Sequence, residues 1–320
     1  MTTENELTRD FDPYLAEGEV KHPDQTDPQF GHLITAMVTP FTADDRVDYQ
    51  AFEALAHKLV EEGSDSLVVS GTTGETSTLE DHEKEGLVRA AKSAVGDRAK
   101  VIAGTSTNHT SHDLEMARRA ERAGADGQLA VTPYYNKPSQ DGVLAHFTAV
   151  ADAVDLPLMV YDIPGRSGIA VSTETMLRLA EHPRIQCLKD AKNDITATTE
   201  VLTKTDLEIY SGDDQNVLAW MAMGASGVVS VTSHVASGHF RRMIDAVLNY
   251  DLREARIYHS ELGPVIRAMM TRIQGAVSSK LVLNWLDFPI RTDVRLPLVQ
   301  ANEAEKELVL ADLREAGWNL

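Results

Sequence analysis

Eight short apolar or β-branched runs alternate with longer stretches of helical period, and this alternation constrains the fold of the 320-residue chain more than any other feature. Helix candidates fill the gaps between the first runs, and several are followed by a glycine that can cap a helix C-terminus. The runs occupy residues 32–40, 66–71, 100–105, 127–133, 157–163, 185–191, 208–213 and 227–233, and the helix candidates residues 49–62, 79–94, 111–123 and 140–153. Because parallel strands need a crossover helix between them, eight strand-then-helix units predict an α/β fold of the closed (β/α)8 type, a TIM barrel.

An open, doubly wound sheet is the alternative fold. Its dinucleotide-binding members carry a glycine-rich turn after the first strand, and residues 40–48 contain no glycine. We therefore expect a catalytic barrel over residues 31–250. Residues 1–30 are rich in acids and prolines and poor in apolar side chains, which predicts a disordered acidic arm. Residues 251–320 are expected to form a C-terminal helical appendage, with helices at 252–272, 277–286 and 303–316.

The composition excludes several classes of function. Thirty basic against 49 acidic residues give a net charge of −19, which argues against a nucleic-acid surface. No apolar run reaches the roughly 18 residues that span a membrane, and the N-terminus lacks the basic-then-apolar order of a signal peptide, so we expect a cytoplasmic protein. The single cysteine, Cys187, excludes an internal disulfide, and the eleven histidines show no metal-ligand spacing, so we expect no metal.

A lysine near the end of the sixth run is the candidate nucleophile. Residues 185–191 read IQCLKDA, and the strand period of two places Lys189 on the same side as the apolar residues Ile185 and Cys187. An ammonium at the mouth of an apolar interior loses hydration, which lowers its pKa from the ordinary value of about 10.4 and frees the amine to attack a carbonyl. A lone lysine just past a strand is more often solvated, so the other strand ends must decide its role.

Other chemically useful side chains follow neighbouring strands of the expected barrel, where catalytic groups gather. Thr72 and Thr73 follow the second run, Tyr135 follows the fourth, and Tyr161 and Arg166 follow the fifth. Each of these has an ordinary structural explanation when taken alone. Together with a lysine amine they suit Schiff-base chemistry on a keto acid, in which hydroxyls carry protons and the arginine or threonines hold carboxylates.

Five motifs make the chain recognisable from about residue 31 to its end. They are GTTGE at 71–75, VTPYYNKPSQ at 131–140, YDIPGRSG at 161–168, LKDA at 188–191 and SGDD at 211–214. The set resembles the pyruvate-dependent aldolase family of dihydrodipicolinate synthase and N-acetylneuraminate lyase, and most closely the dihydrodipicolinate synthase branch. This resemblance implies a lyase of lysine and diaminopimelate biosynthesis that condenses pyruvate with L-aspartate 4-semialdehyde to 4-hydroxy-tetrahydrodipicolinate. It also implies that no cofactor is needed.

The resemblance assigns roles to four catalytic residues. Lys189 matches the lysine that forms an imine with pyruvate, and Tyr161 matches the adjacent phenol that transfers protons. Thr72 and Tyr135 match the rest of a hydroxyl relay, in which Tyr135 reaches into the active site of a neighbouring subunit. A relay shared between subunits implies a homo-oligomer, and the family pattern implies a homotetramer built as a dimer of dimers.

The substrate-binding positions are also carried over from the resemblance. Thr73 matches a contact of the pyruvate carboxylate, and Arg166 matches the arginine that meets the carboxylate of the semialdehyde. Val229, in GVVSV, matches a residue that lines the pocket, and Gly212 belongs to the same substrate-binding set. Arg166 and the second threonine favour the synthase over the alternative, a pyruvate-dependent lyase acting on a sugar acid such as N-acetylneuraminate. A barrel that binds keto acids without turnover is the remaining hypothesis.

One departure from the family pattern concerns feedback by lysine. In lysine-inhibited members a histidine and a glutamate help to bind the effector, and the matching positions here are Lys84 and His112, while Asn108 and Tyr134 are retained. A cation at position 84 and the missing acid at position 112 disfavour an ammonium ligand. We therefore expect weak or absent feedback by lysine, with Asp113 as the residue best placed to restore it.

Overall fold

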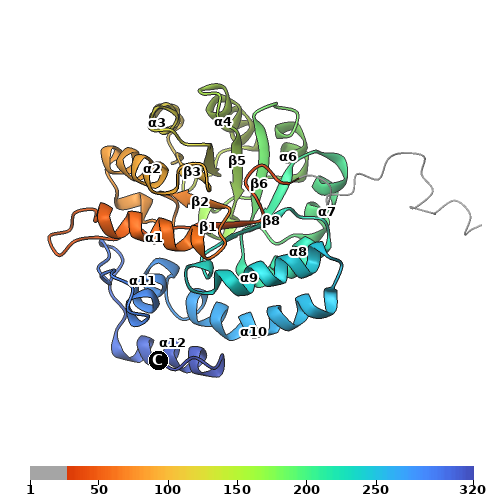
Figure 1. The fold of residues 1–320 in the computed structure, drawn as a ribbon. Coiled ribbons are helices and arrows are strands. Elements are labelled where there is room, and N and C mark those ends of the chain that lie inside the picture. The colour runs from red at the N-terminus through yellow and green to blue at the C-terminus, as the bar shows by residue number, and fades with distance from the viewer. Residues whose placement is uncertain (1–26) are drawn as a thin grey trace, which may run out of the picture.

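A computed structural model describes residues 27–320 and confirms the expected barrel (Figure 1). Within these residues eight parallel strands close into a barrel in the order β1 to β8, with β8 paired to β1. The strands are β1 (Leu33–Ala36), β2 (Ser66–Val69), β3 (Lys100–Gly104), β4 (Gly127–Val131), β5 (Leu158–Asp162), β6 (Ile185–Asp190), β7 (Glu208–Ser211) and β8 (Gly227–Ser230). The open doubly wound sheet is therefore excluded.

Helices follow the strands and surround the barrel, as Figure 1 shows. They are α1 (Tyr49–Glu61), α2 (Asp81–Val95), α3 (Thr110–Ala123), α4 (Gln140–Asp152), α5 (Pro164–Ser167), α6 (Thr173–Leu179), α7 (Ile195–Lys204), α8 (Val217–Ala222) and α9 (Ser233–Leu248), with short 3-10 helices η2 (Thr76–Thr78) and η3 (Asp214–Asn216). Local capping explains where several of them begin. The Asp48 side chain accepts a hydrogen bond from the Ala51 N–H at the start of α1, and the Ser139 side chain caps α4 in the same way.

The observed strands are shorter than the apolar runs that predicted them. The first run was expected to extend to residue 40, but β1 ends at Ala36, and Met37–Pro40 are buried outside the strand. An apolar run reports burial, and a buried loop at the strand end carries the same signal as the strand itself. The segment is still hydrogen-bonded, because the Met37 N–H donates to the Val68 carbonyl oxygen at 3.0 Å.

The barrel interior is filled by apolar side chains, and its base is closed by Phe30. Phe30 is 1% exposed, and a Cβ on Gly127 would lie only 2.4 Å from its ring, so the two residues fit together closely. Core packing therefore begins before residue 31, where the acidic arm was expected to end. The arm expected at residues 1–30 otherwise lies outside the described residues.

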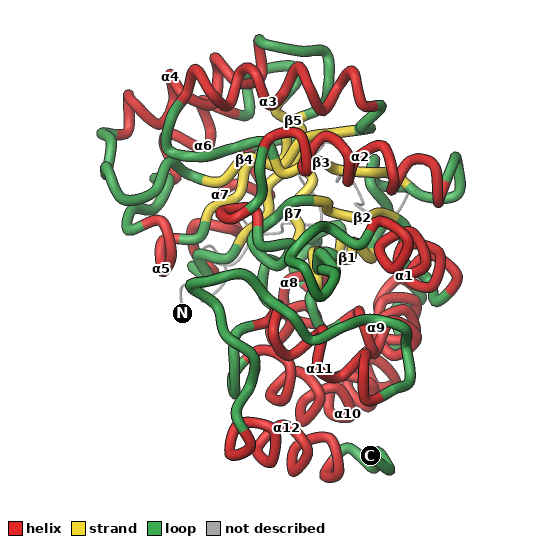
Figure 2. Tube along the Cα trace, turned by 90° about the vertical axis from the view of Figure 1, so that its left-hand side faces the viewer, coloured by secondary structure: helices red, strands yellow, loops and turns green. Residues whose placement is uncertain are grey.

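The C-terminal helices pack along one side of the barrel, as Figure 2 shows. They are α10 (Leu252–Met270), α11 (Gly275–Trp285) and α12 (Glu303–Glu315). Apolar residues of α9, α10 and α12 share one buried cluster. The turn between α10 and α11 reaches the barrel mouth, where Met270, Gln274 and Gly275 line a cavity. The C-terminal region is therefore part of the candidate site as well as an appendage.

Membrane-spanning helices and metal-binding clusters are both absent from residues 27–320. Over this part of the chain, no helix combines the length and the apolar character that a membrane span requires. The same residues contain no group of three or more histidine, cysteine, aspartate or glutamate side chains arranged to hold a metal ion.

Candidate active site

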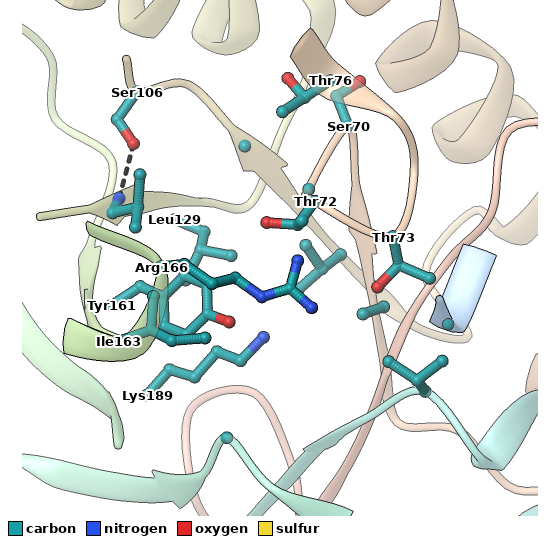
Figure 3. A pocket seen from close by; sticks show the side chains of 18 of the residues that line it. Ser70, Thr72, Thr73, Thr76, Ser106, Leu129, Tyr161, Ile163, Arg166 and Lys189 are labelled. Carbon is teal, nitrogen blue, oxygen red and sulfur yellow. Dashed lines mark hydrogen bonds between the residues drawn. The ribbon is translucent and has the colours of Figure 1, made fainter. Parts of the chain in front are cut away.

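A cavity of about 150 Å³ opens at the C-terminal ends of the strands (Figure 3). Six of the eight expected site residues line it, and they lie at or just beyond the ends of four strands, β2, β5, β6 and β7: Thr72, Thr73, Tyr161, Arg166, Lys189 and Gly212. The structure thus brings together side chains that are up to 140 positions apart in the sequence (212 minus 72). This is the end of a (β/α)8 barrel at which active sites are found.

Lys189 is buried at the end of β6 with its amine facing the cavity, as Figure 3 shows. Its side chain is close to Tyr161, because the two residues are direct partners in the register of β5 and β6, and Nζ lies 4.1 Å from the centroid of the phenol ring. Burial lowers the pKa of Lys189 to about 7; the charge of Asp214 opposes this effect, and that of Arg166 adds to it. A large fraction of the amine is therefore neutral, and nucleophilic, at neutral pH.

Tyr161 supplies a proton donor beside this amine. The residue is 7% exposed, and burial raises the pKa of its phenol to about 12. The phenol therefore stays protonated at neutral pH and keeps a proton that it can donate. An amine nucleophile next to a neutral hydroxyl is the pair that imine chemistry on a carbonyl requires.

The threonine loop, residues 71–75, enters the cavity from the side opposite Tyr161, as Figure 3 shows. Thr72 is exposed toward the opening, whereas Thr73 is 9% exposed. The loop turns sharply, because Ser70, just before it, and Glu75, its last residue, both have a φ of +58°, in the left-handed region. Its hydroxyls and backbone N–H groups are suited to a carboxylate.

Arg166 and Gly212 complete the set of expected residues at the cavity. Arg166 lies on the short helix α5, and Figure 3 shows its guanidinium extending over the cavity toward Thr72. Gly212 follows β7, and a Cβ at this position would lie 2.9 Å from the Cβ of Ala191 and 3.0 Å from the Asp190 carbonyl oxygen. Only glycine lets the two strand ends approach this closely.

Two expected site residues do not line this cavity. Tyr135 is 89% exposed and has a φ of +72°, an unusual conformation for a tyrosine. Val229 is 2% exposed and belongs to the apolar cluster inside the barrel, and it is Val231, two residues further along, that lines the cavity. The period of two keeps both valines on the inner face, but only the later one reaches the mouth.

Several lining residues were not foreseen from the sequence. Ser70 and Ser106 bring hydroxyls to the cavity, and the Ser106 oxygen accepts a hydrogen bond from the Val131 N–H at 2.6 Å. Their place at strand ends was a usable signal. Met270 and Gln274 gave no local signal, because their proximity to the mouth depends on how the C-terminal helices return to the barrel.

In the region expected to control feedback by lysine, His112 and Lys84 already occupy the positions at which an effector ammonium would be expected to bind. The ring of His112 lies 3.0 Å from the Asp81 carboxylate, and Lys84 is 9% exposed, with a pKa that burial lowers. Asp113 is fully buried, and its carboxylate accepts hydrogen bonds from the Thr107 N–H and hydroxyl, both at 2.8 Å. Asp113 is thus not exposed to a ligand, so the expected rescue through this residue is not supported.

Comparison with known proteins identifies a close set of relatives. The model of the dihydrodipicolinate synthetase family matches residues 29–316. The 4-hydroxy-tetrahydrodipicolinate synthase of Kineococcus radiotolerans is 53% identical over 288 residues, which cover 90% of this chain and 94% of that protein. The protein of the same name from Acidothermus cellulolyticus is 51% identical over 90% of this chain and 93% of its own length.

Solved structures show the same architecture. The dihydrodipicolinate synthase of Cyanidioschyzon merolae, crystallised with lysine bound, superimposes with a TM-score of 0.87 at 39% identity, covering 90% of this chain and 99% of that one. The enzyme of Thermotoga maritima superimposes with a TM-score of 0.86 at 34% identity, covering 91% and 99% of the two chains. The similarity therefore extends over the barrel and the C-terminal helices together.

Proposed function

The chain belongs to the dihydrodipicolinate synthetase family, and from this premise we propose that it is a lyase that condenses pyruvate with L-aspartate 4-semialdehyde to 4-hydroxy-tetrahydrodipicolinate. This reaction belongs to lysine and diaminopimelate biosynthesis. The observation that carries the proposal is the buried Lys189 amine, 4.1 Å from the ring of Tyr161, in a cavity that also holds Arg166 and two threonines. Relatives about 50% identical along nine-tenths of the chain bear the name of this activity.

The proposed reaction begins with the neutral amine of Lys189. It attacks the carbonyl carbon of pyruvate, and loss of water leaves an imine, whose electron-withdrawing nitrogen allows the methyl group to lose a proton and form an enamine. The enamine carbon attacks the aldehyde of the second substrate. The amine of that substrate then displaces Lys189 at the former carbonyl carbon, which closes the ring and returns the lysine.

Protons and carboxylates are handled by the other residues at the mouth. Tyr161, whose phenol stays protonated, donates to the oxygen that leaves during imine formation. Thr73 and the threonine loop hold the carboxylate of pyruvate, and Arg166 binds the carboxylate of the semialdehyde through its guanidinium. The imine itself serves as the electron sink, so the proposed reaction needs no cofactor.

We also propose a homotetramer, built as a dimer of dimers, in the cytoplasm. The support for a shared site is Tyr135, an 89% exposed aromatic residue held at a φ of +72° outside the cavity of its own chain. Such backbone strain costs on the order of 1–3 kcal/mol and tends to persist at functional positions. A Tyr135 side chain that enters a neighbouring cavity completes the hydroxyl relay with Thr72 and Tyr161. A monomeric variant with full activity would contradict this arrangement.

Turnover of the purified protein tests the proposed reaction. We expect formation of the ring product from pyruvate and L-aspartate 4-semialdehyde by the wild type, and none by Lys189→Ala. Cleavage of N-acetylneuraminate is measured alongside. If only the sugar acid is cleaved, the Schiff-base chemistry stands and the role of Arg166 is wrong; if neither substrate reacts and pyruvate cannot be trapped on the protein, the non-catalytic barrel replaces this proposal.

A further inference from the structure

A buried ion pair joins the C-terminal helical region to the threonine loop. Lys280 on α11 is fully buried, and its Nζ lies 2.5 Å from a carboxylate oxygen of Glu75, which is 5% exposed. Glu75 ends the segment GTTGE, two residues after Thr73. The two partners are 205 positions apart in the sequence, so the pair exists only because α11 packs against the barrel mouth.

The carboxylate of Glu75 is held entirely by residues from beyond position 279. One oxygen accepts from Lys280 Nζ, and the other accepts from the Arg295 backbone N–H at 2.9 Å. Lys280 is itself oriented by a second hydrogen bond, to the Asp293 carbonyl oxygen at 2.8 Å. A carboxylate fixed at both oxygens cannot shift without breaking a buried polar contact, which is costly.

An aromatic wall and a second ion pair extend this connection. Lys280 Nζ and the Arg295 guanidinium carbon lie 4.3 and 4.4 Å from the ring centroid of Phe41. The same guanidinium donates to the carboxylate of Glu83 and to the Thr78 carbonyl oxygen. The chain is thus attached to the C-terminal region at three points within the eleven residues that follow Thr72 (83 minus 72).

The backbone of the threonine loop needs such an attachment. Glu75 has a φ of +58°, a conformation that a glutamate adopts at an energetic cost and that persists only where surrounding contacts impose it. On its inner side the loop is held by a hydrogen bond from the Thr39 hydroxyl to the Gly74 carbonyl oxygen at 2.7 Å. Buried ion pairs stabilise folds little compared with apolar pairs of the same size, so stability alone does not account for Lys280 and Glu75.

We propose that Lys280 and Glu75 are positioning residues, which set Thr72 and Thr73 at the distance from Lys189 that the pyruvate carboxylate requires. This inference rests on the proposed function, because it assigns the carboxylate of pyruvate to the threonine loop. It gives the C-terminal helices a role in catalysis besides the residues they place in the cavity wall. Displacing a substrate-positioning group by about 1 Å is enough to cost on the order of 100-fold in rate.

Two variants separate positioning from stability. Lys280→Met removes the ammonium and leaves Glu75 as an unpaired buried carboxylate, so we expect a lower Tm together with a fall in kcat/KM for pyruvate of about 10- to 100-fold, mostly through a higher KM. The double variant Glu75→Leu with Lys280→Met replaces the pair by apolar side chains. We expect it to recover most of the Tm but to keep the high KM for pyruvate, because the directional contacts that join residue 75 to the C-terminal region are gone.

A matched control comes from the other end of the barrel. Asp126 also accepts from a lysine and from a backbone N–H: Lys92 Nζ at 2.9 Å and the Val101 N–H at 2.8 Å. Both donors bind one carboxylate oxygen of a partly exposed pair, and no residue of that trio lines the cavity. Lys92→Met should therefore leave the KM for pyruvate within about twofold of the wild type. The KM for the semialdehyde, which Arg166 governs, should change little in all variants.

The outcomes are distinct. The proposal is overturned if the double variant regains the wild-type KM along with its Tm, or if Lys280→Met leaves the KM unchanged. Should Lys280→Met fail to fold, the double variant gives the same decision. If the wild type does not accept the semialdehyde, the proposed function fails separately. The variants are then compared by the pyruvate concentration that half-saturates borohydride trapping at Lys189. This measurement needs no second substrate.

Discussion

Lys189 at the barrel mouth and Lys280 in the C-terminal region are both buried, yet only one of them has a carboxylate in contact with its ammonium group. Lys280 is in direct contact with the Glu75 carboxylate. Among the described residues Lys189 forms no ion pair, and Asp214 acts on it through charge alone. Burial lowers the pKa of both lysines, but only at Lys280 does a contacting carboxylate oppose it.

One fold thus uses the same side chain in two ways. A lysine that shares hydrogen bonds with a carboxylate is held in place and has no lone pair for chemistry. A lysine that is desolvated without a partner destabilises the fold, but its neutral amine is a nucleophile, which imine formation needs.

Removing the amine at the mouth should abolish the chemistry. Lys189→Ala is expected to lose all measurable turnover, because no other amine faces the cavity among the residues described as lining it. Mass spectrometry after borohydride reduction with pyruvate should show one adduct on the wild type and none on the variant. An adduct of equal yield on Lys189→Ala would transfer the role of nucleophile to another lysine.

Removing the neighbouring phenol should have the next largest effect. Tyr161→Phe keeps the ring beside Lys189 but removes the proton donor, so kcat should fall about 10²- to 10⁴-fold. The matched control is Tyr210→Phe, on the opposite neighbour of Lys189 in the sheet, whose hydroxyl donates to Glu208 at 2.9 Å and does not line the cavity. Equal losses in both variants would show that packing around the lysine, and not proton transfer, is responsible.

The rate of imine formation should depend on pH through Lys189. Its pKa is lowered to about 7, so the reactive neutral amine predominates above this pH and declines about tenfold per pH unit below it. Trapping rates at a low, fixed pyruvate concentration should therefore rise with pH and level off above about pH 7. A profile that still rises toward the ordinary lysine value of 10.5 would mean that the mouth does not desolvate the amine.

Added lysine should have the smallest effect, because a third lysine of the chain, Lys84, places a cation at the expected effector position. Lys84 is largely buried on α2, and His112 is already beside the Asp81 carboxylate. An added ammonium would face a fixed cation, so millimolar lysine should change turnover by less than about twofold. Strong inhibition by lysine in a direct activity assay would contradict this expectation, and the pair of His112 and Asp81 would then be the first contacts to test.

The sequence alone was enough to predict the barrel, and six of the eight candidate site residues that it offered line one cavity. The alternation of eight runs with helical stretches predicts the closed sheet, and the strand period places Lys189 among apolar neighbours, where the structure finds it. Strand limits were less accurate, as at β1, because buried loops and strands share one apolar signal. Phe30 falls within the predicted acidic arm because one aromatic residue hardly changes the average composition of residues 1–30.

Other features depend on distances that no sequence pattern reports. Tyr135 and Val229 stand in the right motifs, yet neither lines the cavity of this chain, since the motif does not specify which side of a loop or which layer of a barrel a side chain occupies. Gln274 lines the cavity because α10 returns to the mouth. The residues around Gln274 in the sequence do not predict that it lies at the barrel mouth.

The kinds of chemistry available can be deduced from the amino-acid sequence: a strand-end lysine, a phenol, hydroxyls and an arginine in an α/β barrel. Which buried lysine is paired follows from the folded chain, because Glu75 contacts Lys280, 205 positions away, and does not contact Lys189. The physical reason is that periodicity records local burial, whereas the charge state of a buried lysine depends on what is packed against it from elsewhere in the chain.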